Sequence, residues 1–172
     1  MKKLLIVVDM QNDFIDGSLG TSEAQAIVPK VAQKIKEWEG KIIVTQDTHF
    51  DNYLTTQEGI NLPVMHCQYR SFGHILNNAV ASALKLKSGV KYIEKSTFAS
   101  TKLVDIVKDY DPDSIQLCGL CTDICVVSNA LLLKAFFPEK PIAVDSACCA
   151  GVTPDKHAAA LETMRSCQVE VI

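Results

Sequence analysis

The sequence has no long apolar run, no concentration of basic residues and no flexible linker. Its first apolar run, residues 4–8, ends at Asp9, far too early for a signal peptide or a membrane span. The 17 Lys and Arg residues are outnumbered by 20 Asp and Glu, which gives a net charge of -3, and no run of five basic residues occurs. Because phosphate binding needs surplus positive charge, we expect a cytoplasmic protein that binds neither nucleic acid nor membrane.

Nothing in the composition divides the chain. No stretch rich in Pro, Gly or Ser, no repeat and no low-complexity segment interrupts the 172 residues, which is the length of about one domain. Hydrophobic residues make up 48% and charged residues 22%, a globular balance. We therefore predict a single domain over residues 1–172. The seven cysteines are odd in number and irregularly spaced, which favours a reducing compartment in which they act as small hydrophobes or nucleophiles.

Short apolar runs alternate with longer helical patterns along the chain. The predicted strands are residues 4–8, 41–46, 90–94, 114–118, 141–144 and 168–172. The predicted helices are residues 24–39, 76–86, 100–110, 122–137 and 154–166. Strands that are apolar along their whole length are typical of a parallel sheet covered on both faces. The fold class is therefore α/β, a three-layer Rossmann-like parallel sheet with helices on both faces.

Open parallel sheets bind their ligands beyond the carboxyl ends of the strands. The groups that follow the first five predicted strands are Asp9, Asp47, Lys95, the segment 119–125 and Asp145. Any one of them is explained by a strand meeting solvent, but all five together favour a functional site at this edge.

Among the cysteines, Cys125 is the best candidate for a nucleophile. If Thr122 caps a helix that follows the fourth strand, Cys125 lies in its first turn, where the helix dipole and free N–H groups stabilise a thiolate and an oxyanion. The alternative is structural burial, because apolar residues follow Cys125. Cys118 is expected in a strand, and the small apolar surroundings of Cys148, Cys149 and Cys167 favour structural burial.

A thiol needs a base, and Asp9 is suited to that role because it follows five apolar residues on what we expect to be a central strand. Burial raises the pKa of a carboxyl toward the working range. Lys95, after the adjacent predicted strand, can supply the partner that a buried carboxylate requires. The alternative is a buried ion pair of Asp9 and Lys95 without catalysis.

Three segments together resemble the signatures of the nicotinamidase/isochorismatase-like cysteine hydrolases. They are VVDMQNDF at 7–14, EKSTF at 94–98 and GLCTDICV at 119–126. The resemblance implies that family's fold, a catalytic triad of Asp9, Lys95 and Cys125, a cis peptide before Cys121, and an oxyanion hole formed by the N–H groups of Cys121 and Cys125.

The activity implied by the resemblance is hydrolysis of a small amide through a thioester, because true isochorismatases generally lack the cysteine. Nicotinamide, converted to nicotinate and ammonia, is the favoured substrate. The resemblance also implies a homo-oligomer and a divalent metal, Zn²⁺, Fe²⁺ or Mn²⁺. The Asp47-Thr48-His49 segment and His66 resemble the family's metal ligands, and the spacing of Glu58 makes it a fourth. The alternative is that these histidines line a polar loop.

Two departures from the nicotinamidase pattern leave the substrate open. The usual Gly-Thr pair is missing after His66, and no tryptophan lies just before His66 to stack on a pyridine ring, since the only tryptophan is Trp38. Phe14 is expected to form one wall of the substrate pocket, with Phe98 or Tyr69 as a second wall. Another small amide, a ureido compound or an N-carbamoyl compound is therefore an alternative substrate. A silent binding protein on this fold, and a redox or metal-thiolate cluster at Cys118, Cys121 and Cys125, are rival interpretations.

Overall fold

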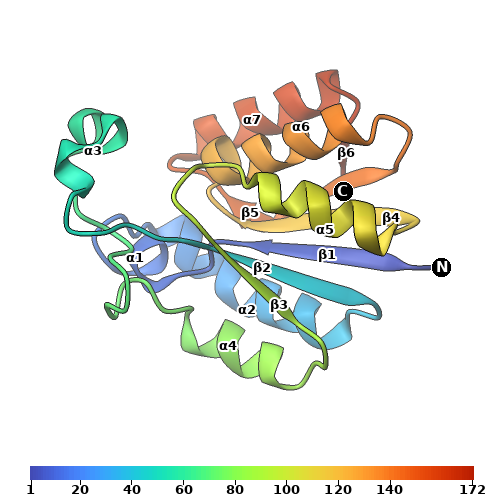
Figure 1. The fold of residues 1–172 in the computed structure, drawn as a ribbon, viewed down its shortest axis with the longest axis horizontal. Coiled ribbons are helices and arrows are strands. Elements are labelled where there is room, and N and C mark those ends of the chain that lie inside the picture. The colour runs from blue at the N-terminus through green and yellow to red at the C-terminus, as the bar shows by residue number, and fades with distance from the viewer.

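One six-stranded sheet organises the chain (Figure 1). The computed structural model describes all residues, 1–172. The strands are β1 (Lys3–Val8), β2 (Lys41–Asp47), β3 (Lys91–Lys95), β4 (Ser114–Leu120), β5 (Ile142–Ala150) and β6 (Glu170–Val171). They lie in the order β3-β2-β1-β4-β5-β6, and every neighbouring pair is parallel. This is the strand order of a Rossmann fold, as predicted.

The central strand owes its position to its sequence. Residues 4–8 of β1 are all fully buried, because helices cover both faces of the sheet. The long helices are α2 (Ser22–Glu37) and α4 (Asn78–Lys85) on one face, and α5 (Thr101–Tyr110), α6 (Val127–Phe136) and α7 (Pro154–Ser166) on the other (Figure 1). The three-layer prediction is confirmed. None of the helices combines the length and the apolar character that crossing a bilayer requires.

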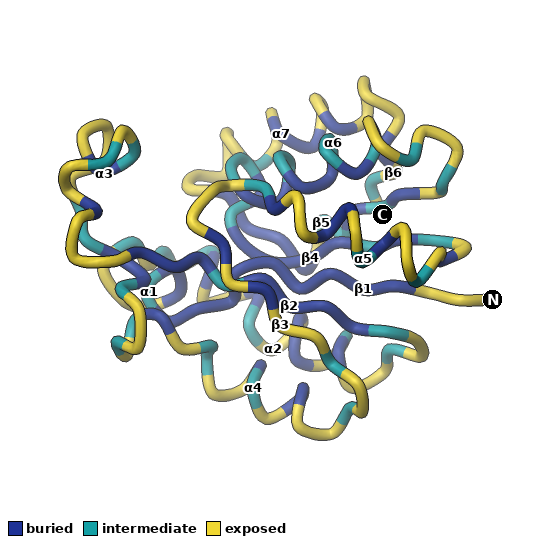
Figure 2. Tube along the Cα trace, viewed as in Figure 1, coloured by how far each residue is buried: buried dark blue, intermediate teal, exposed yellow.

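Short elements gather at the carboxyl edge of the sheet. They are α1 (Asn12–Ile15), the 3-10 turn η1 (Tyr53–Thr55) and α3 (Gln57–Asn61). Figure 2 shows that α3 stands away from the body of the protein and is largely exposed. The segment between β2 and α4, for which the sequence shows little regular pattern, contains only η1 and α3 as helical turns.

The chain reverses its direction of progress through the sheet at β1. It passes from β1 outward to β2 and β3, and then returns to the other side of β1 to build β4, β5 and β6. The loops after β1 and β4 therefore diverge and leave a crevice, which is where open α/β sheets hold their ligands. The fold directs attention to Asp9, which follows β1, and to the turn that follows β4.

The fifth strand differs from the prediction, and Asp145 is not at the edge of the sheet. β5 extends to Ala150 because its pairing with β4 is irregular: Leu117 opposes Val144, whereas Gly119 opposes Cys149. Asp145 lies in this irregular stretch, and its carboxylate is 2.6 Å from the ammonium of Lys34 on α2. The carboxylate therefore ties β5 to α2 and takes no part in a site at the carboxyl edge.

Truncation of Leu5 tests the central position of β1. Leu5 is 0% exposed, so Leu5→Ala should lower the free energy of unfolding in urea by about 2–5 kcal/mol, through lost burial and the cavity left behind. Leu86, which is 72% exposed, is the matched control, and Leu86→Ala should change that free energy by no more than about 0.5 kcal/mol. Equal losses for both variants would contradict the described burial.

Candidate active site

Asp9 leaves the end of β1 in an unusual conformation. Its φ of 46° is left-handed, which few residues other than glycine adopt, and its carboxylate is completely buried. Thr45 on β2 donates a 2.6 Å hydrogen bond from Oγ1 to Asp9 Oδ1. The Asp9 N–H donates to the Thr45 carbonyl at 3.2 Å. These contacts hold the other oxygen, Oδ2, toward the crevice between β1 and β4.

Lys95 is the last residue of β3 and is also buried. Its Nζ lies 2.6 Å from Asp9 Oδ2 and 3.5 Å from Cys125 Sγ. Burial favours a neutral amine, but the negative charge of Asp9 outweighs it and raises the pKa of Lys95, so this side chain stays an ammonium. A single cation therefore contacts both the carboxylate and the thiol.

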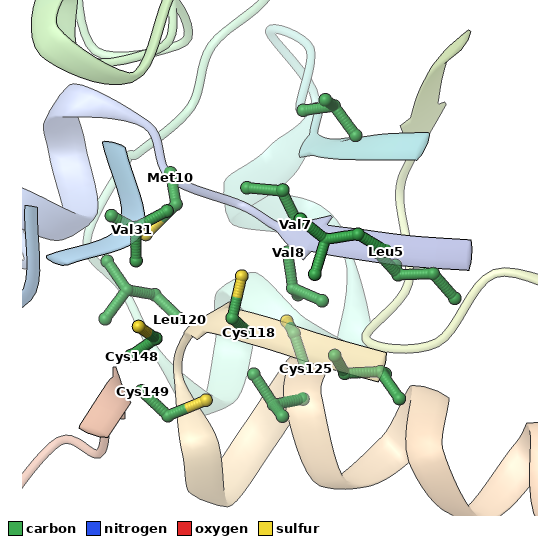
Figure 3. Packing of buried hydrophobic residues seen from close by; sticks show 14 of the residues in the cluster. Leu5, Val7, Val8, Met10, Val31, Cys118, Leu120, Cys125, Cys148 and Cys149 are labelled. Carbon is green, nitrogen blue, oxygen red and sulfur yellow. The ribbon is translucent and has the colours of Figure 1, made fainter. Parts of the chain in front are cut away.

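The turn after β4 brings Cys125 to this cation. The Leu120–Cys121 peptide is cis, as the family resemblance implies. Gly119 has a φ of 119°, and a Cβ there would lie 2.1 Å from the carbonyl oxygen of Val8, so only glycine allows β4 to pass this close to β1. Cys125 belongs to the same apolar cluster as Val8 (Figure 3).

The predicted cap of the following helix is wrong. Cys121 occupies the N-cap position, and Thr122 is the first residue of a π-helical turn, η2 (Thr122–Val126), which leads into α6. Thr122 is fully buried, and its hydroxyl lies 2.8 Å from Nδ1 of His157 on α7. The hydroxyl therefore bonds to another helix instead of capping its own. Cys125 nevertheless remains within the first turn.

Asp9, Lys95 and Cys125 together contain one negative charge and one positive charge that offset each other. Burial raises the pKa of the Asp9 carboxyl, an effect that Lys95 opposes. Burial also raises the pKa of the Cys125 thiol well above its ordinary value, and the charge of Asp9 adds to this. The resting sulfur is thus a thiol, not the thiolate that its helix position suggests. Moving its proton to Asp9 leaves the total charge of the three groups unchanged, which avoids creating an uncompensated charge in a buried site.

A cavity of about 260 Å³ opens onto the sulfur. Its lining includes Phe14, Phe98, Cys121 and Cys125, with Ile124 between the two cysteines. Tyr69, the other candidate for a second wall, stacks near Phe50 and His74 instead. A larger hollow of about 730 Å³ adjoins the cavity but does not reach Cys125. The two share Glu58, Leu62, Phe98 and Ile124.

One donor for an oxyanion is free at the turn. The carbonyl of Cys121 accepts hydrogen bonds from the N–H groups of Ile124 and Val126, each at 3.1 Å, whereas the Cys121 N–H itself donates to no protein acceptor. Cys121 and Cys125 both line the cavity. A backbone donor that is free beside a nucleophilic sulfur can stabilise charge that develops on an attacked carbonyl oxygen.

Four ligand-type side chains meet beside this cavity, and three of them, Asp47, Glu58 and His66, line it. They are Asp47, His49, Glu58 and His66, and one ligand atom from each lies within 4.8 Å of all the others. The Nε2 atoms of His49 and His66 lie 2.9 Å and 3.4 Å from Asp47 Oδ2. Two carboxylates and two imidazoles that converge in this way are a donor set for a divalent transition metal.

The protonation pattern of the group suits a cation. His66 Nδ1 lies 2.8 Å from the Val64 carbonyl, which can only accept, so Nδ1 carries the proton and Nε2 presents its lone pair to the group. Burial alone would raise the pKa of Asp47, but the contact with His49 and the positive charge of Lys95 outweigh burial and hold that pKa well below its usual range. Asp47 is therefore ionised, and its Oδ1 lies 3.7 Å from Lys95 Nζ.

Some residues of the site were not singled out from the sequence. Thr45 gives a weak signal, as a hydroxyl in the otherwise apolar first part of β2. Thr21 and Lys156 line the cavity from α2's N-cap and from α7, and their sequence surroundings give no signal of this role. Asp9, Lys95, Cys125 and the four ligand-type residues were singled out, and the structure brings them to one place.

The fold and its thiol-lined cavity define a class: an α/β protein with a parallel sheet and a small-molecule site at the carboxyl edge of its strands. The sequence profile of the family described as Isochorismatase domain matches residues 3–172. The chain therefore belongs to the isochorismatase family, and the family resemblance drawn from its three motifs is confirmed.

Similar proteins cover almost the whole chain. The nicotinamidase/pyrazinamidase of Mycobacterium tuberculosis is 26% identical over 187 residues, covering 99% of this chain and 98% of the relative. The crystal structure of a nicotinamidase/pyrazinamidase from Bacillus subtilis matches with a TM-score of 0.87 at 23% identity, over 99% of both chains. The pyrazinamidase of Pyrococcus horikoshii in complex with zinc matches with a TM-score of 0.84 at 25% identity, over 100% of this chain and 99% of that one.

Thiol labelling tests the resting state of the sulfur. In a Cys167→Ser variant, which removes the exposed cysteine, iodoacetamide should modify Cys125 slowly at pH 7 and faster as pH rises, because burial keeps the thiol protonated. Cys118, which is buried and does not line the cavity, should react only after unfolding. Peptide mass mapping gives each rate. Modification of Cys125 at pH 7 as fast as that of Cys167 in the parent protein would contradict a resting thiol.

Proposed function

We propose that this protein is a cysteine-dependent amidohydrolase of the nicotinamidase type, with nicotinamide as the favoured substrate and nicotinate and ammonia as products. The observation that carries the proposal is the position of Lys95 Nζ, in contact both with Asp9 and with Cys125, whose side chain lines a small cavity. Such an arrangement supplies a base, a nucleophile and a fixed positive charge within one buried cluster.

The first half of the reaction follows from this arrangement. Asp9 accepts the proton of Cys125 as the sulfur adds to the amide carbonyl carbon, and the N–H groups of Cys121 and Cys125 stabilise the oxyanion. Lys95 stays charged beside both groups throughout. When the C–N bond breaks, Asp9 returns the proton to the departing nitrogen, so that ammonia leaves and a thioester on Cys125 remains.

The second half uses the same groups on water. Asp9 takes a proton from a water molecule whose oxygen adds to the thioester carbonyl, and the oxyanion occupies the same donors. Collapse of this intermediate breaks the C–S bond, and Asp9 returns its proton to the sulfur. The carboxylic acid is released and Cys125 is again a thiol, so that one amide and one water give one acid and one ammonia.

The cavity suits a small, flat substrate. Its volume of about 260 Å³ is below the range of drug-sized pockets, and Phe14 and Phe98 offer aromatic walls. Asp47, His49, Glu58 and His66 would hold a divalent cation, Zn²⁺, Fe²⁺ or Mn²⁺, which when bound would orient the substrate and polarise it. The names of the similar proteins, nicotinamidases and pyrazinamidases, support this substrate class, and the zinc of one of them supports the cation.

The position of Lys156 favours a second substrate class, amides that carry an acidic group. Lys156 lines the cavity, and no carboxylate of the protein pairs with its ammonium. A cation at this place suits an amide that carries an acidic group, such as a ureido acid or an N-carbamoyl acid, which would undergo the same chemistry at its C–N bond.

Removal of the nucleophile tests the proposed function. Ammonia release should be screened over nicotinamide, pyrazinamide, ureido acids and N-carbamoyl compounds, and Cys125→Ala should lower the rate on the accepted substrate at least about a thousandfold. Thermal unfolding should show that the variant is folded. Cys167→Ala, which removes an exposed thiol far from the proposed chemistry, is the control and should retain full activity. Full activity of Cys125→Ala would reject the mechanism.

Thr45 allows the role of Asp9 to be tested through pH. Asp9 must be ionised to accept a proton, so kcat/KM should fall as pH falls through the pKa of Asp9, which burial places above its ordinary 3.8. The Thr45 hydrogen bond lowers that pKa, so Thr45→Val should move the acid limb of the profile upward by about one pH unit.

The matched control for this shift is Thr48→Val. The Thr48 hydroxyl bonds to the Gln46 carbonyl and to His74, not to Asp9, so its removal should leave the acid limb in place. An unchanged limb in Thr45→Val, or an equal shift in both variants, would remove Asp9 from the role of base.

A further inference from the structure

Three polar residues of the first motif, Gln11, Asn12 and Asp13, take no part in the chemistry described above, yet they are bonded to the segments that carry the ligand group. We propose that Gln11 and Asp13 are positioning residues that hold Asp47 and His66 in place for a divalent cation. The inference rests on the cation site of the proposed function and deepens it, because it assigns the residues that determine the geometry of that site.

Gln11 clamps the end of β2. Its Oε1 accepts the Asp47 N–H at 2.7 Å, and its Nε2 donates to the Asp47 carbonyl and to the His74 carbonyl, both at 2.8 Å. Gln11 is completely buried, so none of these bonds competes with water. The side chain thus fixes both polar groups of the Asp47 backbone, and links them to the loop that follows His66.

Only an amide satisfies this clamp. The site presents one N–H and two carbonyls, which require one acceptor and two donors on the same side-chain group. A carboxylate has no donor for the carbonyls. An apolar side chain removes the partner of the Asp47 N–H and of the Asp47 carbonyl, at a cost for each, and leaves the His74 carbonyl only its 3.2 Å hydrogen bond from Gln46 Nε2. The need to bond the backbone of Asp47 therefore explains why an amide side chain occupies position 11. Contact with a substrate does not explain it, because Gln11 does not line the cavity.

Asp13 clamps the other ligand segment. Its Oδ2 accepts the Cys67 N–H at 2.7 Å, and its own N–H donates to the Gly73 carbonyl at 3.1 Å. A Cβ on Gly73 would lie 1.9 Å from Asp13 Oδ2, so the loop backbone packs directly against this carboxylate. The Cys67 carbonyl in turn accepts the His49 N–H at 3.0 Å. The backbone of Cys67, the residue next to His66, thereby connects Asp13 to His49.

Gln11 and Asp13 each help to place one of two ligand side chains that must converge on the same ion. Asp47 and His66 lie on separate segments, the end of β2 and the loop before α4, and their side chains must converge to share an ion. Residues that orient ligands in this way generally contribute 10–100-fold to metal affinity. Because Gln11 and Asp13 act through the backbone of the ligand segments, their removal should weaken cation binding without removing any ligand.

Calorimetric titration with Zn²⁺ and Mn²⁺, on protein without substrate, tests the proposal. Asp13→Ala should raise the Kd about 10- to 100-fold. Asp13→Asn keeps an oxygen that can accept the Cys67 N–H and should restore most of the affinity. Gln11→Met should weaken binding as Asp13→Ala does. Asn12→Ala is the matched control, because Asn12 Nδ2 donates at 2.9 Å to the Phe72 carbonyl of the same loop and not to a ligand segment. The Kd of this variant for the cation should stay within about twofold of the parent value.

Several outcomes would overturn the proposal. It fails if the parent protein binds neither cation, if Asp13→Ala and folded Gln11→Met bind as tightly as the parent, or if Asn12→Ala loses as much affinity as they do. If Gln11→Met does not fold, the contrast between Asp13→Ala and Asp13→Asn decides. Because the titration requires no turnover, a parent protein that binds the cation but releases no ammonia would reject the proposed function and leave this inference intact.

Discussion

The arrangement of the whole site depends on one buried ammonium. Lys95 ends β3, which is separated from β4 by two strands, yet its Nζ reaches Asp9, Cys125 and Asp47. Without this charge, the carboxylate of Asp9 would be buried with no cation beside it, which is a costly arrangement in a protein interior. The cation makes it possible for an acid, a thiol and a metal-type ligand group to share one crevice.

This dependence explains why the crevice lies where it does. β1 supplies Asp9, β2 supplies Thr45 and Asp47, β3 supplies Lys95, and the turn after β4 supplies the sulfur, so four adjacent strands each deliver a group to one edge. The polar residues after β1 then bind the neighbouring loop to that edge. The sheet therefore positions the carboxylates, the ammonium and the sulfur, whereas the loops mainly complete the walls of the cavity.

The sequence predicted those parts of the molecule that depend on local pattern. Apolar runs alternating with helical periodicity were enough for the sheet and its layers, and the residues that follow the strands included Asp9, Lys95 and Asp47. The errors arose where a distant partner decides. Asp145 is turned to α2 by Lys34, and the Thr122 hydroxyl bonds to His157 instead of capping its helix. The protonation of Cys125 depends on burial by several elements, which no spacing reveals.

The close approach of β1, which leads to Asp9, and β4, which leads to Cys125, depends on one glycine. At Gly119, β4 comes so close to the Val8 carbonyl that there is room for a hydrogen atom and nothing larger. Any larger residue at this position would push β4 away from β1, and would thereby move Cys125 away from Asp9. The position of Cys125 relative to Asp9 therefore depends on a residue that has no reactive atom, located where the two halves of the sheet meet.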